Sequence, residues 1–280
     1  MYQQNSAGPR GTVERIADAM MLDAVRRIKK RRRTRLWVPD DPVILARRAG
    51  LVPDPWQADV LHSSAQQLLL NCSRQSGKSQ TTATLALYTA LYQPVSLVLL
   101  LSPSLRQSSE LFKKVTMLYR VLGRPIAAEA ESALRLELDN GSRIVALPGK
   151  EGTVRGYSGV RLLIVDEASR VEDDLYYSIR PMLAVSGGRL VALSTPFGKR
   201  GWWFDAWQNG GAAWERVEVR AEQCPRIPAD FLAEERRALP PHVYASEYEC
   251  QFVDNLQMVF SSDLVRGMIS AEARPLAVSW

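Results

Sequence analysis

Short aliphatic runs alternate with longer helical patterns from residue 67 onward, and this alternation limits the chain to few architectures. The successive pairs of run and helical pattern are Leu68 to Leu70 with Ser79 to Leu91, and Leu97 to Leu101 with Arg106 to Leu122. Neighbouring parallel strands need crossover connections of this kind, and the helices cover both faces of the sheet that results. The order therefore predicts an α/β fold with a mostly parallel sheet flanked by helices.

Two further aliphatic runs, Leu162 to Val165 and Leu190 to Leu193, have the composition of buried strands. Upstream of them, Leu134 to Leu138 and Ile144 to Leu147 flank a turn that contains an Asn-Gly pair. Asn-Gly between apolar runs is a strong hairpin signal. We therefore expect one antiparallel excursion within the parallel sheet.

The N-terminal part differs from the rest of the chain in its charge. Apolar residues recur at helical spacing between Val13 and Ile28, which predicts an amphipathic helix that runs into the basic block Arg26 to Arg35. This block supplies eight positive charges, and because the chain carries a net charge of +6, the remainder sums to 6 − 8 = −2. The basicity is therefore local, and it favours contact of one segment with nucleic acid or, alternatively, with an anionic membrane surface.

Composition also places two boundaries in the chain. Prolines between Pro39 and Pro55 precede the first strand, and helical patterns at Ala229 to Leu239 and Val243 to Phe252 follow a last strand at Trp214 to Val219. The sequence predicts a helical basic arm over residues 1–50, a core over residues 51–222 and a small helical subdomain over residues 223–280.

The apolar runs and the cysteines argue against several protein classes. The longest nearly apolar run, Val95 to Leu101, covers seven residues, whereas a membrane helix needs about 20. The first residues lead into no apolar segment typical of a secretory signal, so we expect a cytosolic protein that makes no membrane contact. Cys72, Cys224 and Cys250 form no C-x-x-C pair and favour neither a disulfide scaffold nor a zinc site.

One segment between a strand and a helix matches the phosphate-loop pattern. It comprises Cys72, Ser73, Arg74, Gln75, Ser76, Gly77, Lys78 and Ser79, and Gln80 continues into the helix. Gly77 supplies free torsions, so backbone N–H groups can wrap a polyphosphate at the start of a helix. Lys78 can reach the β- and γ-phosphate oxygens, and the Ser79 hydroxyl can bind Mg²⁺. Cys72 stands where the strict pattern has glycine, and the alternative is a coincidental turn.

Two adjacent carboxylates follow another aliphatic strand. The run Arg161 to Val165 delivers Asp166 and Glu167 at its carboxyl end, the edge of a parallel sheet where the phosphate loop also lies. Asp166 can hold Mg²⁺, and Glu167 can polarise water for attack on a γ-phosphate. The alternative is that both acids cap the helix that follows.

Two further groups of residues have competing interpretations. Glu172, Asp173 and Asp174 suggest a two-metal nuclease, but they stand where a helix begins and their simpler role is to complement its dipole. Four aromatic residues suggest base stacking, but their helical spacing favours packing of a helix on the sheet. These residues are Trp202, Trp203, Phe204 and Trp207.

In their order along the chain, four motifs resemble those of the ATPase domain of large terminase subunits, the motors that package DNA into tailed-phage heads. The motifs are Pro55-Trp56-Gln57, the arginine-containing loop Ser73 to Ser79, Val154-Arg155-Gly156 and Leu193-Ser194-Thr195-Pro196. The match extends from about Pro53 to Phe260, most of the chain. The resemblance implies an ASCE-type, RecA-like P-loop NTPase with Walker A and Walker B motifs, a helical N-terminal arm and a C-terminal lid subdomain.

The resemblance also implies roles for individual residues. Gln57 would lie near the adenine, Arg74 would be the additional phosphate-loop arginine, and Arg155 would be the arginine finger. The Ser194-Thr195-Pro196 segment would be the coupling motif that senses hydrolysis. The residues alone also allow purely structural roles: a helix N-terminal hydrogen bond for Gln57, a surface salt bridge for Arg155, and a simple strand end for Ser194-Thr195-Pro196.

By the same resemblance, we expect ATP and Mg²⁺ as cofactors and a location in the host cytoplasm, at the portal vertex of a procapsid. Expected partners are double-stranded DNA, the portal protein, the small terminase subunit and other copies of the chain in a homo-oligomeric ring, a pentamer in the family. The basic block Arg26 to Arg35 would contact DNA, dock on an acidic surface of the portal or a neighbouring subunit, or remain a solvated charge run.

One departure from the family and two competing functions complete the expectations. Large terminases generally carry an RNase H-like nuclease domain after the ATPase, but only about 20 residues follow Val259, so we expect no DNA cleavage by this chain. A superfamily 2 helicase-like ATPase is one alternative function, although it needs a second RecA-like domain. A nucleotide-gated assembly protein without fast turnover is the other, and Glu167 argues against it.

Overall fold

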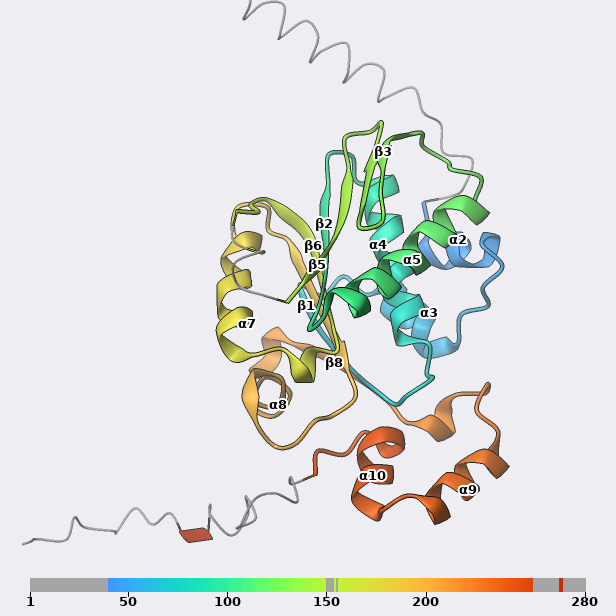
Figure 1. The fold of residues 1–280 in the computed structure, drawn as a ribbon, viewed down its shortest axis with the longest axis vertical. Coiled ribbons are helices and arrows are strands. Elements are labelled where there is room, and N and C mark those ends of the chain that lie inside the picture. Colours follow the sequence, from blue (N-terminus) through green and yellow to red (C-terminus); the bar gives the residue numbers. More distant parts are fainter. Residues whose placement is uncertain (1–39, 150–153, 155, 254–266, 269–280) are drawn as a thin grey trace, which may run out of the picture.

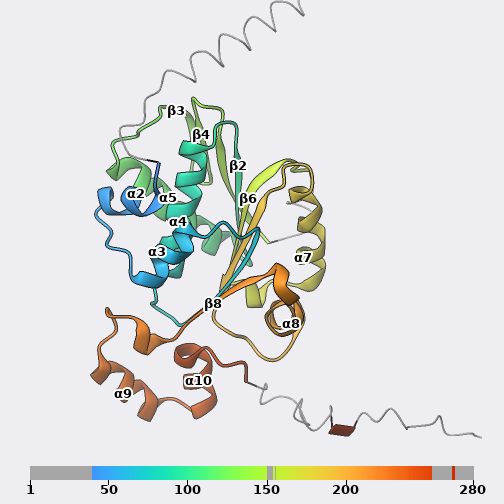
Figure 2. The same cartoon turned by 180° about the vertical axis from the view of Figure 1, so that it is seen from behind.

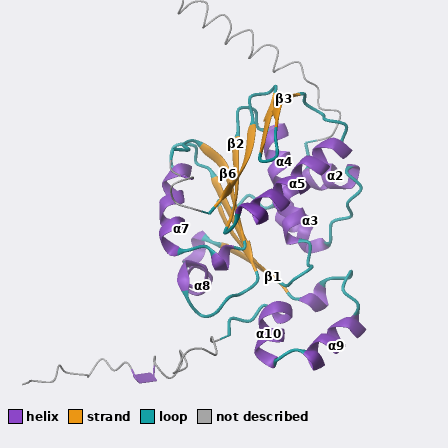
Figure 3. Cartoon of the chain, in the orientation of Figure 1, coloured by secondary structure: helices purple, strands orange, loops and turns teal. Residues whose placement is uncertain are grey.

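An eight-stranded sheet forms the centre of the part of the chain that this computed structural model describes, residues 40–149, 154, 156–253 and 267–268. The strand order is β3-β4-β5-β2-β6-β7-β1-β8. The strands are β1 (Gln67–Cys72), β2 (Leu97–Ser102), β3 (Ala128–Glu131), β4 (Arg135–Leu138), β5 (Arg143–Pro148), β6 (Val160–Asp166), β7 (Arg189–Ser194) and β8 (Glu215–Val219). Figure 3 shows them in orange, between the helices.

Helices cover both faces of this sheet, as the views from front and back show (Figures 1 and 2). One face carries α2 (Pro42–Arg48), α3 (Pro55–His62), α4 (Lys78–Tyr92) and α5 (Leu105–Val121). The other carries α7 (Asp173–Ile179) and α8 (Gly201–Asn209), whereas α9 (Ala229–Ala238) and α10 (Pro241–Glu249) lie together beyond one end of the sheet. Within the described residues there are also the 3₁₀ turns η1 (Ala168–Arg170), η2 (Arg180–Leu183), η3 (Gly211–Ala213) and η4 (Ala221–Gln223).

The predicted α/β architecture is confirmed by the strand directions. From β5 to β8 every neighbouring pair is parallel, and β7 lies between β1 and β6. An additional strand therefore separates the strand before the phosphate loop from the strand before the acids, which is the ASCE arrangement. The carboxyl ends of both strands lie at the same edge of the sheet.

The predicted antiparallel excursion is also confirmed. Strands β4 and β5 pair antiparallel, and Gly141 in their connection has a φ of +80°. The sequence did not indicate β3, which pairs antiparallel with β4. Its residues are Ala-Glu-Ala-Glu at the border of the sheet, so no aliphatic run marks this strand.

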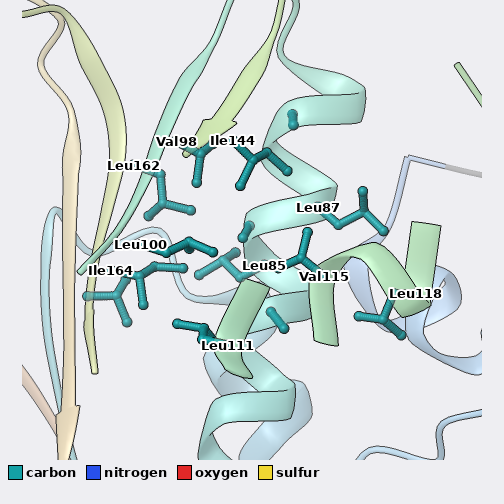
Figure 4. Close-up of a cluster of buried hydrophobic side chains, with 14 of the residues drawn as sticks. Leu85, Leu87, Val98, Leu100, Leu111, Val115, Leu118, Ile144, Leu162 and Ile164 are labelled. Carbon is teal, nitrogen blue, oxygen red and sulfur yellow. The ribbon is translucent and has the colours of Figure 1, made fainter. Parts of the chain in front are cut away.

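Buried aliphatic side chains fill the space on both faces of the sheet, because successive residues of a strand point to opposite faces. Figure 4 shows Leu100 and Ile164 directed toward Leu85 of α4. The neighbouring Leu99 and Leu163 belong to the core on the opposite face, under α7 and α8. Strands that are buried on both sides need continuous apolar runs, which explains the composition that predicted them.

Helix α2 packs on the same core although it precedes the expected boundary at residue 50. Val43, Leu45 and Ala46 are buried in the cluster that contains α4 and α5. The Asp41 carboxylate accepts hydrogen bonds from the backbone N–H groups of Val43 and Ile44 at 2.7 and 2.9 Å, and so caps the helix. The domain limits remain a prediction, and the arm helix with its basic block Arg26 to Arg35 lies outside the described residues.

The aromatic residues after β7 pack a helix on the sheet, as their spacing predicts. Trp202 and Trp203 of α8 are only 3% and 2% exposed, so they present no platform for nucleic-acid bases. The Trp202 indole donates to the Val171 carbonyl at 3.0 Å. None of the helices within the described ranges combines the length and apolar character that a membrane crossing requires.

Candidate functional site

The phosphate-loop residues and the two acids meet at the carboxyl edge of the sheet, as the sequence predicts. The loop follows β1, and Asp166 is the last residue of β6. The Ser79 hydroxyl lies 3.4 Å from a carboxylate oxygen of Asp166, although 87 positions separate the two residues in the chain. The hydroxyl, the lysine and both carboxylates therefore lie near one another at one edge of the sheet.

The loop has the backbone conformation that its glycine suggests. Gly77 has a φ of +93°, in the left-handed region, and it is the N-cap residue of α4. The Lys78 side chain folds back under the loop, where its ammonium donates to the Ser73 carbonyl at 3.3 Å. Ser76 donates to the same carbonyl at 2.9 Å. The lysine charge is thus held inside a turn of backbone at a helix N-terminus, where anions are favoured.

The two acids have different environments. Asp166 is buried and accepts a hydrogen bond from the Glu167 backbone N–H at 3.0 Å. Burial, followed by the charge of Glu167, raises the pKa of Asp166 to about 6, and Lys78 partly offsets this rise. Glu167 has a φ of +52° and stands at the N-cap of η1 without a side-chain capping hydrogen bond. The capping interpretation is therefore wrong for Glu167, whose backbone has a strained left-handed conformation directly after Asp166.

Replacing Asp166 with Asn is expected to stabilise the protein in the absence of nucleotide. Because the pKa of Asp166 rises from 3.8 to about 6 on folding, its charged form destabilises the fold. The resulting loss in the free energy of unfolding is complete above about pH 6 and vanishes below about pH 4. Urea unfolding of Asp166→Asn should show a gain of about 1–3 kcal/mol at pH 8 and almost none at pH 4.

The matched control for this prediction is Asp174→Asn, which removes an exposed acid from the first turn of α7. Its free energy of unfolding should not rise at pH 8. Equal stabilities of wild type and Asp166→Asn at both pH values would contradict the prediction.

The phosphate-loop arginine contacts the C-terminal helices. Both the Nε and Nη2 atoms of Arg74 donate to the Glu247 carboxylate of α10, the latter at 3.1 Å. The Arg74 backbone N–H also donates to the Glu247 carbonyl at 3.0 Å. The loop is therefore joined to α10 by a bidentate ion pair and a backbone hydrogen bond.

The segment that the resemblance implies for coupling also contacts α10. Ser194 and Thr195 are buried at the end of β7, and the Ser194 hydroxyl lies 2.7 Å from the hydroxyl of Ser169 in η1, just after the acids. The Pro196 carbonyl accepts a hydrogen bond from Ser246 of α10 at 2.9 Å. The segment thus lies between the acidic strand end and the C-terminal helices.

Gln57 makes the helix N-terminal hydrogen bond that was its alternative interpretation, and it also contacts the loop. Its Oε1 accepts from the Asp54 backbone N–H at 2.9 Å, and its Nε2 donates to the Ser76 carbonyl at 3.4 Å. A cavity of about 450 Å³ opens beside these groups. Its walls come from the α2–α3 connection, the first turns of α4, and Pro225 with Arg226.

Three charged residues of the site were missed by the sequence analysis: Asp54, Arg226 and Glu247. The guanidinium of Arg226 donates to both carboxylate oxygens of Asp54 at 2.8 Å, and to the Ser76 carbonyl at 2.9 Å. A helix-start signal was present at Asp54, since it precedes a proline and a glutamine stands three residues later. No local pattern distinguishes Arg226 or Glu247 from other surface residues.

Two remaining predictions have different outcomes. Asp173 and Asp174 lie in the first turn of α7, and the Asp173 carboxylate accepts from the Trp202 backbone N–H at 2.7 Å. Asp173 therefore supports the start of α8, and the helix-start interpretation of the acidic run is confirmed. Arg155 lies outside the described residues, so its role as an arginine finger remains a prediction.

Comparison with known proteins agrees with the motifs. The family model for the N-terminal part of T4likevirus-type terminase large subunits matches residues 69–266. Large terminase subunits of Thermus phage G20c and Thermus virus P23-45 are each 24% identical over 256 residues, which covers 76% of this chain and 51% of each relative. The chain thus spans about half the length of the curated relatives that it matches.

Solved structures share the fold. The large terminase ATPase domain of Thermus phage P74-26 superposes with a TM-score of 0.66 at 21% identity, covering 74% of this chain and 97% of that domain. A large terminase from a thermophilic bacteriophage, in complex with ADP, gives a TM-score of 0.62 at 10% identity, covering 72% of this chain and 54% of that one. Because the family model spans the phosphate loop, both acids and the segment after β7, the chain belongs to the T4likevirus-type family of terminase large subunits.

Proposed function

We propose that the chain is an ATP-hydrolysing motor subunit of a viral terminase, which translocates double-stranded DNA into a procapsid. The observation that carries the proposal is the meeting of the phosphate loop with Asp166 and Glu167 at one sheet edge. Phosphoryl transfer depends mainly on positioning and charge stabilisation, and this edge of the sheet supplies a cation, backbone donors and two acids. The ADP complex of the thermophilic bacteriophage terminase supports a nucleotide as the ligand of this fold.

Within the site, the loop residues Ser73 to Gln80 bind the phosphates. Backbone N–H groups at the start of α4 donate to the phosphate oxygens, which the conformation of Gly77 permits. Lys78 contacts the β- and γ-phosphates once its ammonium leaves the Ser73 carbonyl. Glu167 accepts a proton from the attacking water, and its carboxylate is suited to this because no capping hydrogen bond occupies it.

The oxygens of Ser79 and Asp166 fit a Mg²⁺ ion. They are hard oxygen ligands only 3.4 Å apart, and a cation would compensate the charge of the buried Asp166 carboxylate. Mg²⁺ also takes few protein ligands beside substrate phosphates. When bound, the ion neutralises charge that develops on the phosphate oxygens. Asp166 and Ser79 would be the protein groups that hold it, at the start of α4 and the end of β6.

The cavity beside Gln57 would hold the adenine base. Its lining is largely apolar and includes Leu51, Val52, Pro53 and Pro225. Gln57 also lines it, and its amide keeps one N–H and one lone pair beyond the hydrogen bonds already described. This arrangement supports the role near adenine that the family resemblance implies.

Motion of DNA would follow from contacts between the site and the C-terminal helices. Ser194-Thr195-Pro196 contacts η1 at one end and α10 at the other, which supports a coupling role for this segment. The expected partners are double-stranded DNA, the portal protein, the small terminase subunit and further copies in a ring at the portal vertex in the host cytoplasm. Arg155 would supply its guanidinium within one subunit or to the site of a neighbour.

Phosphate release by the purified full chain tests the proposal. With ATP and Mg²⁺ we expect many turnovers per chain and faster release when duplex DNA is added. Release of one phosphate per chain, with no further turnover, would instead identify a nucleotide-gated assembly protein. A second experiment mixes Arg155→Ala subunits with Lys78→Ala subunits. If Arg155 acts between subunits, the mixture should recover ATP hydrolysis. If the mixture stays inactive, Arg155 acts within its own subunit.

A further inference from the structure

Arg226 lies where three parts of the molecule meet. It belongs to the connection between η4 and α9, which leads from the sheet into the C-terminal helices. Its guanidinium contacts Asp54, the residue before α3, and the Ser76 carbonyl of the phosphate loop. The Asp54 side chain is 10% exposed and the Arg226 side chain 48%, so a nearly buried carboxylate fixes a guanidinium at the surface.

The contact with Ser76 acts on the turn that opens α4. The Ser76 carbonyl precedes Gly77, the left-handed residue on which the direction of the loop amides depends. A Cβ atom at Gly77 would lie 2.6 Å from Nε2 of Gln57 and 3.2 Å from Nη2 of Arg226. These two side chains therefore cover the turn, and both donate to the same carbonyl.

We propose that Arg226 is a positioning residue of the nucleotide site, which holds the phosphate loop in its binding conformation from the start of the C-terminal helices, with Asp54 as its anchor. The proposal rests on the proposed nucleotide site and goes beyond its known motifs. Arginine suits this position because its planar fork can pair with both carboxylate oxygens and still donate to a carbonyl. A lysine has the same charge, but its ammonium is a single point that lacks the planar fork needed to pair with both oxygens of Asp54.

A consequence is that the C-terminal segment contacts the loop at both ends. Glu247 of α10 binds Arg74 near the start of the loop, and Arg226 binds the Ser76 carbonyl near its end. A movement of α9 and α10 would therefore alter the loop through two contacts.

The first test measures hydrogen exchange of residues 76–82 in the full chain without nucleotide. In Arg226→Gln the exchange rate of these amides should rise about fivefold or more, because the carbonyl that fixes the turn loses its charged donor. The matched control is Arg220→Gln, which removes the same charge from the same segment but from an arginine that pairs with Glu218. Equal exchange in both variants would overturn the proposal.

The second test measures steady-state ATP hydrolysis. Arg226→Gln should raise KM about tenfold and change kcat less than threefold, with Arg226→Lys intermediate. Asp54→Asn should shift KM in the same direction, and the double variant should be no worse than Arg226→Gln because the two residues act through one contact. A lower melting temperature with unchanged KM in Arg226→Lys and Asp54→Asn would show a merely structural role and overturn the proposal.

The two tests separate this inference from the proposed function. If the wild-type chain hydrolyses no ATP, the proposed function fails, and the exchange experiment still decides whether Arg226 holds the loop. If hydrolysis is present and neither KM nor exchange responds to Arg226, the positioning role fails alone.

Discussion

Glu167→Gln is expected to lower kcat for ATP by about 100-fold to 10,000-fold, the usual contribution of a general base. Glutamine keeps the size of the side chain and cannot accept the proton of the attacking water. Glu167 accepts no capping bond, so its replacement leaves the start of η1 intact. The affinity for ATP should stay within about threefold of wild type, because the loop that binds the phosphates is unchanged. Steady-state phosphate release and titration with a fluorescent ATP analogue measure the two quantities.

Glu172→Gln is the control for this experiment. Glu172 is exposed and lies five positions after Glu167. It also stands at an N-cap, that of α7, without a side-chain capping hydrogen bond. Its kcat should remain within about twofold of wild type, since it stands at the start of α7 and not at the strand end that carries Asp166 and Glu167. Comparable rates for the two variants would remove Glu167 from the catalytic role.

Gly77→Ala is expected to weaken nucleotide binding by about 100-fold. Two costs combine at this position. A side chain at a φ of +93° is strained by about 1–2 kcal/mol, and the new Cβ would lie 2.6 Å from Nε2 of Gln57. Relief of either cost rotates the loop amides away from the phosphates. Isothermal titration with ADP measures the loss.

Gly123→Ala separates strain from contact. Gly123 has a φ of +74°, and an added Cβ meets no atom within 4 Å. This variant should lose about 1–2 kcal/mol of stability and bind ADP as wild type does. If Gly77→Ala bound ADP equally well, the loop would not depend on the conformation described here.

The sheet and its helices were predictable because burial on two faces forces a recognisable composition. The run Leu97 to Leu101 has little alternative to a central strand, and it is followed by a helical pattern at the length that a crossover requires. Strand β3 was not predicted because it lacks this burial on two faces. It lies at a border, buries little and gains its pairing from β4 rather than from its own side chains.

The site residues that directly follow a strand were predictable, whereas those placed by tertiary contacts were not. Lys78, Asp166 and Glu167 follow strands whose carboxyl ends share an edge, so sequence order alone brings them together. Arg226 is 172 positions from its partner Asp54, and Glu247 is 173 positions from Arg74. No short-range spacing relates these residues, and only the folded chain brings them together.

Both borders of the sheet carry charged residues. Glu129 and Glu131 stand on β3 at one border, and Glu215, Arg216 and Glu218 stand on β8 at the other. Charges on a border strand oppose the addition of a strand from a second molecule. Continuous intermolecular sheets are therefore disfavoured, and we expect copies of this chain that assemble to associate through their helical faces and loops.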